Sequence, residues 1–296
     1  MGAEILSVFI LVLALILLIA YWQRSKKRLI AAKLSSQQTL LNCTRLLGLT
    51  RHLQQHRGMS SAWLSGDQNF ASRREGKTKE ILALLPGLSE LVNQESLQNC
   101  PCITVNEWVL FRHHWKELLE ALPKLSVEQS IARHSQLINK VLEWLAAIGE
   151  ARIEPLASER EMVGAARNYA HRLPLLTECL GQARAIGSSV TAQHSCPPVA
   201  RVRLLFLISR AEALLEQAVA AHGSGVMTSR SQQAIKEMVA TVRTRMLFSS
   251  GVVVKSEEYF EMSTKAIDLV FEWIGACERS TQCFMEGVSV KELHPC

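Results

Sequence analysis

Leu53-Gln54-Gln55-His56-Arg57-Gly58-Met59-Ser60-Ser61-Ala62-Trp63-Leu64 sets one arginine on the apolar side of an expected helix. The positions that share the face of Arg57, at three- and four-residue steps, are mostly core residues: Leu46, Leu53, Ser60 and Leu64. An unpaired guanidinium in such a place costs several kcal/mol, so it needs an anion. The stretch therefore predicts a helix with an inward arginine, whose partner is either an acidic side chain or a bound ligand.

The composition predicts an all-α protein. The chain has 296 residues, 48% of them hydrophobic, which is enough for one large core or two smaller ones. Only 6% are aromatic, and long segments rich in Leu, Ala, Glu, Gln and Arg contain few of the eight prolines and fifteen glycines. We expect one or more up-and-down antiparallel helical bundles.

The charge distribution argues against a nucleic-acid-binding protein, and the cysteine distribution argues against a disulfide-rich one. Arg24, Lys26, Lys27 and Arg28 supply four of the six net positive charges, so the basicity is local and we expect no nucleic-acid partner. The eight cysteines are scattered along a large chain rather than forming a dense framework. Their distribution indicates reduced thiols and a reducing compartment.

The first segment predicts a membrane anchor. Residues 5–23 contain no charged side chain, and this run is long enough to span a bilayer. The basic cluster at 24–28 follows it. A cleaved signal peptide would have a basic start and a shorter apolar core. The positive-inside rule then predicts a single pass through the inner (cell) membrane, with the amino terminus outside and the remainder in the cytoplasm. A buried core helix is the alternative.

Four parts follow from these signals: the anchor at 1–23, a basic juxtamembrane start and helical stalk at 24–45, a bundle at 46–287 and a tail at 288–296. Proline, glycine and polar clusters separate the expected helices. Ser126 is the expected cap of one helix, with Gln129 as its capping-box partner. The expected helices cover 29–64, 72–94, 105–122, 127–152, 158–193, 199–221, 229–248 and 256–286.

A second copy of the motif occurs in the later half of the chain. The stretch 53–61 aligns with 180–188, Leu-Gly-Gln-Ala-Arg-Ala-Ile-Gly-Ser, so Arg184 corresponds to Arg57. Arg184 also lies on an apolar stripe, with Leu173, Leu176, Leu180 and Gly187. The two arginines could face one another across a pseudo-symmetric bundle, although so short a match also arises by chance.

The sequence carries no pattern typical of catalysis. It has no nucleophile with a matched base, no phosphate-binding glycine loop and no dinucleotide fingerprint, so we expect neither an enzyme nor a cofactor. Soft metal ligands are present at Cys100, Cys102, His113 and His114. The two cysteines lack the second matched pair of a zinc site, so we expect no metal.

Small and hydroxylated residues accompany both arginines. Ser60 and Ser61 follow Arg57, and Ser188 follows Arg184, so helices can approach closely while hydroxyls remain available to a ligand. Two guanidinium forks match a planar oxyanion better than a lysine would. The alternative is that each arginine pairs with a Glu or Asp of a facing helix.

Three segments resemble the nitrate- and nitrite-sensing domain family. They are the motif at 53–64, the helix start at 70–81 and the aromatic, Thr- and Ile-Asp-containing segment at 256–268, which together bracket most of the chain after residue 45. The resemblance implies an all-helical sensor that binds nitrate or nitrite through arginines and signals to an output module. The sequence differs from the family pattern at His56, where an acidic residue is usual.

The resemblance also implies the ligand-binding residues. Arg57 matches the family's motif arginine, and Arg184 occupies the matching place in the second half. A third arginine is expected from a later helix, either Arg243 or Arg245; Arg245 is the better candidate because it shares a stripe with Met238 and Val242. The predicted set is Arg57, Arg184, Arg245, Ser60, Ser61 and Ser188.

Together these features predict a membrane-anchored cytoplasmic sensor. Nitrate or nitrite would bridge Arg57 and Arg184 and shift a two-state bundle, which we expect to be a homodimer that signals to an unidentified partner protein. The alternative is a ligand-free membrane scaffold of the same fold, with both arginines in internal ion pairs.

Overall fold

The structure, a computed structural model, describes residues 2–221, 225–249 and 251–291, with the backbone alone at 2–17, 19–20, 25, 27–33 and 286–291. The regular elements of these ranges are all helical, which confirms the predicted all-α class. They are α1 Gly2–Leu64, α2 Phe70–Ser96, α3 Val105–Ala121, α4 Val127–Ile148, α5 Arg160–Arg167, α6 Leu173–Ala192, α7 Pro198–Ala221, α8 Val226–Thr241 and α9 Ser256–Lys291.

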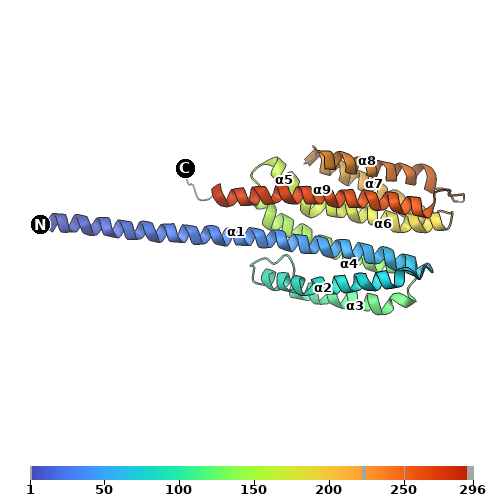
Figure 1. Cartoon of the computed structure of the whole chain (residues 1–296), viewed down its shortest axis with the longest axis horizontal. Coiled ribbons are helices and arrows are strands. Elements are labelled where there is room, and N and C mark those ends of the chain that lie inside the picture. Colours follow the sequence, from blue (N-terminus) through green and yellow to red (C-terminus); the bar gives the residue numbers. More distant parts are fainter. Residues whose placement is uncertain (1, 222–224, 250, 292–296) are drawn as a thin grey trace.

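The helices form two four-helix halves, α1 to α4 and α6 to α9, with short α5 between them (Figure 1). In the first half α1 packs against α2 and α4, and in the second α6 packs against α7 and α9. Across the halves, α1 contacts α6 and α9, and α4 contacts α6. The two copies of the motif therefore occupy the first long helix of each half.

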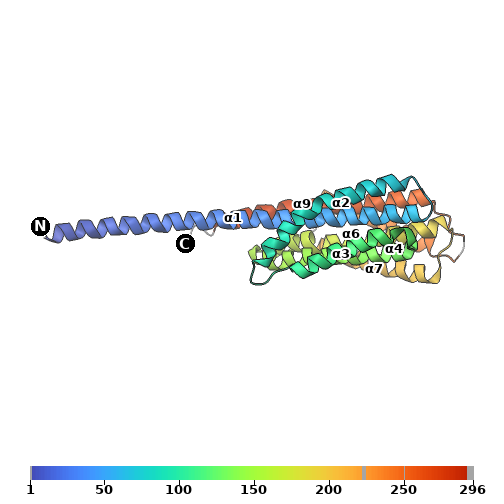
Figure 2. The ribbon, with the colours of Figure 1, turned by 90° about the horizontal axis from the view of Figure 1, so that it is seen from below.

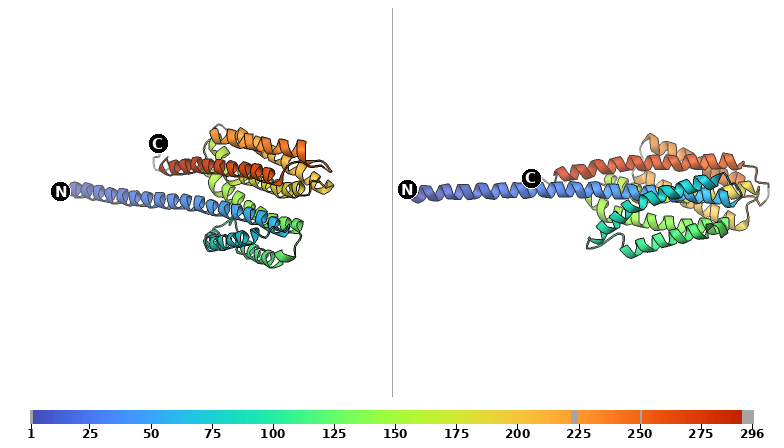
Figure 3. Two further views of the ribbon diagram at one scale, coloured as in Figure 1. Left: turned by 45° about the vertical axis from the view of Figure 1, so that its right-hand side comes forward. Right: turned by 60° about the horizontal axis from the view of Figure 1, so that its bottom comes forward.

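Helix α1 continues far beyond the bundle as a single rod, and the carboxyl end of α9 lies beside it (Figures 1 and 3). No helix has a long enough apolar run to cross a membrane among the residues whose side chains the structure describes. The predicted anchor at 5–23 falls almost entirely outside those residues. Helix α9 includes the first residues of the predicted tail, and residues 292–296 lie outside the described ranges.

Local sequence signals explain three helix starts. The Ser126–Gln129 capping box is present as predicted, and a second box joins Thr104 to Glu107 at the start of α3. Pro86 lies inside α2 without ending it. The predicted interruption at Pro174 is a π-helical turn over Asn168–Arg172, after which the proline occupies the first turn of α6, where its missing N–H needs no partner.

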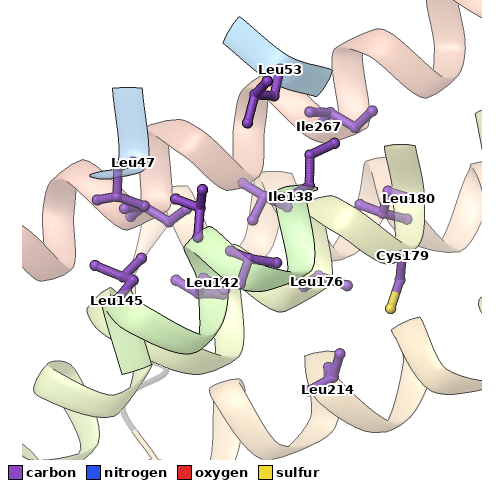
Figure 4. Close-up of a cluster of buried hydrophobic side chains, with 14 of the residues drawn as sticks. Leu47, Leu53, Ile138, Leu142, Leu145, Leu176, Cys179, Leu180, Leu214 and Ile267 are labelled. Atoms are coloured by element: carbon purple, nitrogen blue, oxygen red, sulfur yellow. The ribbon is translucent and has the colours of Figure 1, made fainter. Parts of the chain in front are cut away.

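The core lies where the four inner helices meet. Leu53 of α1, Ile138 of α4, Leu180 of α6 and Ile267 of α9 converge there, and all are buried (Figure 4). Burying each such side chain contributes about 1.5–3 kcal/mol, so these contacts fix the helices against one another. Figure 2, in which the molecule is seen from below, shows α1 above α6 and α4. Any polar group among these helices is therefore held in a rigid, apolar setting.

Candidate functional site

Arg57 points into the core, as predicted, and it is fully buried. Its guanidinium makes a bidentate ion pair with Glu178 of α6, with Nη1–Oε1 2.5 Å and Nη2–Oε2 3.1 Å. Nη1 also donates to Ser135 Oγ of α4 at 2.8 Å. Gln54 and Gln182 donate to the same carboxylate, which therefore has four donors around it. An acidic side chain thus neutralises Arg57, which was one of the two alternatives.

Arg184 of α6 is also buried, with 9% of its surface exposed, but its surroundings differ. Nη1 donates to Thr264 Oγ1 at 3.0 Å, and the guanidinium lies 5.2 Å from the centre of the Phe260 ring. Within the described part of the chain, no carboxylate forms an ion pair with it. Burial, and secondarily the positive charge of Arg57, lowers the pKa of Arg184 to about 10. It therefore remains a cation at neutral pH without an anionic partner.

Each of the two arginines reaches across the contact between α1 and α6 to the opposite helix. Arg57 Nη2 lies against α6 at Gly181, where an added side-chain carbon would come within 2.7 Å of it. Arg184 Nη2 lies against α1 near Gly58, where such a carbon would be 3.8 Å away. Small residues thus let each guanidinium reach the backbone of the opposite helix. The motif copies face each other as the internal alignment predicted.

The charges of this cluster do not balance. Arg57 and Glu178 cancel, and Arg184 leaves one buried positive charge, which is costly without an anion. Two buried donors on the helices that carry the arginines, Arg57 Nε of α1 and Ser188 Oγ of α6, also lack a hydrogen-bond partner among the described residues. Such donors are the ones that a bound group can use, because buried polar groups are normally paired. The arrangement suits a small anion next to Arg184.

The predicted serines have different surroundings. Ser60 is buried, and its Oγ lies 3.3 Å from His56 Nδ1. Ser61 Oγ donates to the carbonyl oxygen of Arg57 at 2.9 Å, within its own helix. Only Ser188 among the three has a buried hydroxyl that is free to contact a ligand, and it lies one helical turn after Arg184.

The third predicted arginine lies elsewhere in this structure. Arg245 is about half exposed and pairs with Glu258 at 3.0 Å, and Arg243 pairs with Glu212 at 2.6 Å. The apolar stripe of α8 continues to Met246 instead, because residues 242–246 form a π-helical turn. That turn has more residues than an α-helical turn, so position 246 rather than 245 follows Val242 on the buried face. The role of Arg245 in ligand binding stays a prediction.

A pair of buried histidines next to the site was not predicted. His56 Nδ1 lies 2.8 Å from His134 Nε2, and His134 Nδ1 lies 2.7 Å from the Ser130 carbonyl oxygen. Burial is the main cause that lowers the pKa of His56 to about 2 and that of His134 to about 3. Both rings are therefore neutral, and they join α1 to α4 beside the Arg57–Ser135 contact. The sequence pattern that could have indicated a buried His134 is its position on the same apolar stripe as Ile131 and Ile138.

The residues weighed as metal ligands do not form a cluster. Cys102 Sγ contacts the Ala147 carbonyl oxygen, whereas His113 and His114 lie on exposed positions of α3. No group of three or more potential metal ligands occurs among the described residues.

A surface hollow of about 420 Å³ adjoins Arg184. Phe260 and Thr264, the two side chains that contact the Arg184 guanidinium, line this hollow together with Arg230 and Lys265. Three acidic side chains, Glu261, Asp268 and Glu272, line it as well, and Arg230 pairs with Glu272 at 3.5 Å, so the charges around the hollow are mixed.

Comparisons with known proteins agree with the observed fold and with the predicted family. The family model described as "Nitrate and nitrite sensing" matches residues 48–274. A solved structure described as that of the NasR transcription antiterminator is similar, with a TM-score of 0.67, 14% sequence identity, and coverage of 94% of this chain and 84% of the other. At that identity the likeness concerns the fold alone. No curated protein matches the sequence.

Proposed function

We propose, since the chain belongs to the nitrate and nitrite sensing family, that it binds one nitrate or nitrite ion between α1, α6 and α9. The observation that carries the proposal is Arg184, a buried cation without an anionic partner in the described structure. Arg57 Nε and Ser188 Oγ supply further donors from facing helices. A planar oxyanion can accept hydrogen bonds from several such donors at once.

Binding would change the balance among the helices. The ion would replace or add to the contact from Arg184 to Thr264, which joins α6 to α9. It would also approach Arg57, which joins α1 to α6 through Glu178. A ligand shifts a conformational equilibrium only by its differential affinity for the two states, so a change at this junction is the expected signal. We propose that α1 and α9, which lie side by side, transmit it.

The sensor would be anchored in the inner membrane by residues 5–23, with the bundle in the cytoplasm. The continuous helix α1 supports this proposal, as do Leu18, Tyr21 and Trp22, which are 67%, 69% and 57% exposed. Exposed aromatic residues are typical of a membrane interface. We further propose that the protein is a homodimer and that a separate signalling partner protein registers the shift of α1 and α9.

The experiment is a thermal unfolding series on the full-length chain in detergent, with nitrate, nitrite and chloride. Nitrate at about 100 times its Kd should stabilise the protein by about 2.7 kcal/mol. Arg184→Gln should remove this effect, whereas Arg243→Gln, a matched loss of a surface arginine, should retain it. A wild-type protein that nitrate and nitrite leave unchanged would contradict the proposal.

A ligand-free scaffold is the second candidate, and the Arg57–Glu178 pair favours it. It predicts that loss of Arg57 lowers stability equally with and without nitrate. Arg184 argues against it, because a purely structural bundle would gain by replacing an unpaired buried cation with an apolar side chain.

A further inference from the structure

We propose that Glu178 restricts this site to monovalent anions. The inference rests on the proposed function and adds to it a residue that sets ligand valence. Three buried charges belong to the cluster: two arginines and one glutamate, whose surface is 2% exposed. One monovalent anion makes their sum zero.

A divalent anion would leave the same cluster with a net negative charge. In a buried site the excess charge has no water to solvate it, so the complex with sulfate is disfavoured relative to that with nitrate. Without Glu178 the two arginines would carry two positive charges, and sulfate would balance them. Glu178 therefore acts on ligand choice through its charge and does not have to contact the ligand.

The contacts of Glu178 hold it in this position. Both carboxylate oxygens accept hydrogen bonds from Arg57, and Gln54 and Gln182 donate to the same group from α1 and α6. These four donors hold the carboxylate in a fixed position. A ligand therefore meets a preformed cluster in which Arg184 is the cation that remains to be neutralised.

The other acidic groups near Arg184 do not contribute a buried negative charge. Asp268 and Tyr259 influence Arg184 electrostatically, but Asp268 pairs with Arg51 at the surface, at 3.2 Å, and Tyr259 is a neutral phenol. Burial raises the pKa of Tyr259 above its ordinary value, which keeps it neutral. Glu178 is thus the buried negative charge that enters the balance.

The test compares sulfate with nitrate on the full-length chain by calorimetry. In the wild type, the Kd for sulfate should exceed that for nitrate by about 100-fold or more. In Glu178→Gln, which keeps the size and an acceptor oxygen, this ratio should fall by at least about tenfold, the scale expected of a nearby charge at an effective dielectric of about 20. Glu178→Asp should retain the preference.

Glu212→Gln is the matched control. It removes the same charge from a surface ion pair with Arg243, so the ratio should stay at the wild-type value. An unchanged ratio in Glu178→Gln would overturn the proposal. If that variant is unfolded in buffer, sulfate must restore cooperative unfolding, and failure to do so overturns the proposal as well. A wild type that binds no nitrate would instead remove the proposed function itself.

Discussion

Replacing Arg184 by methionine should stabilise the ligand-free protein. Methionine has a similar length and similar helix propensity, so the change removes the charge while leaving an apolar chain of comparable volume. Arg184 has no carboxylate partner in the described structure and is 9% exposed. The usual effect of deleting a buried polar contact is a loss of stability, so a gain would identify the strain of an unpaired charge.

The magnitude follows from the pKa. The fall in the pKa of Arg184 from its ordinary value to about 10, caused mainly by burial, corresponds to about 3 kcal/mol against the buried cation, at about 1.4 kcal/mol per tenfold change in proton affinity. Neutral pH lies below both values, so the penalty is fully present there. Loss of the hydrogen bond to Thr264 offsets about 1–1.5 kcal/mol. The expected net gain is about 1–2 kcal/mol.

The assay is urea unfolding of the full-length protein, followed by circular dichroism at neutral pH in a buffer without nitrate. Arg243→Met, at a half-exposed ion pair, should change the unfolding free energy by less than about 0.5 kcal/mol. Added nitrate should stabilise the wild type and the control but not Arg184→Met. A loss of more than about 2 kcal/mol in Arg184→Met without nitrate would refute the reasoning, because it would mean that the protein already satisfies this cation.

Two further predictions concern packing and pH. Gly187→Ala should lower the unfolding free energy by about 1–3 kcal/mol or more, because the added carbon would come within 2.3 Å of the buried Tyr259 ring. The control is Gly48→Ala, which should be neutral or stabilising because an added carbon at Gly48 would have no neighbour within 4 Å. Chemical unfolding measures both variants. The His56–His134 pair should make the protein less stable in acid. The pKa values of about 2 and 3 in the folded state lie below the ordinary 6.5, so the unfolded chain takes up protons first as the pH falls. The unfolding free energy should therefore decline below pH 6.5 by up to about 2.7 kcal/mol per pH unit. Unfolding curves from pH 7.5 to 5 test this, and equal slopes in wild type and in the His56→Gln/His134→Gln variant would contradict it.

Periodicity and turn residues predict most of this fold. The helix from 29 to 64, the turn after Leu64 and the Ser126 cap all follow from short-range signals, as does the inward direction of Arg57. The internal alignment additionally predicts the position of Arg184. These properties depend on residues within a few turns of one another, which one sequence contains.

The partner of each arginine could not be predicted in the same way. Glu178 and Arg57 are 121 positions apart, and a glutamate inside an apolar segment gives no indication of which cation it meets. Stripe counting puts Arg245 on the apolar face, whereas Met246 lies there, because such counting assumes a constant helical period that the π-helical turn interrupts. His134 has the pattern of an ordinary core histidine, and only the packing of α4 against α1 brings it to His56.

The most direct test is a structure of the protein determined with nitrate. The account predicts one planar ion within hydrogen-bond distance of the Arg184 guanidinium, with Arg57 still paired to Glu178. Nitrate bound at another surface, or a saturated crystal in which Arg184 still contacts only Thr264 and Phe260, would contradict it.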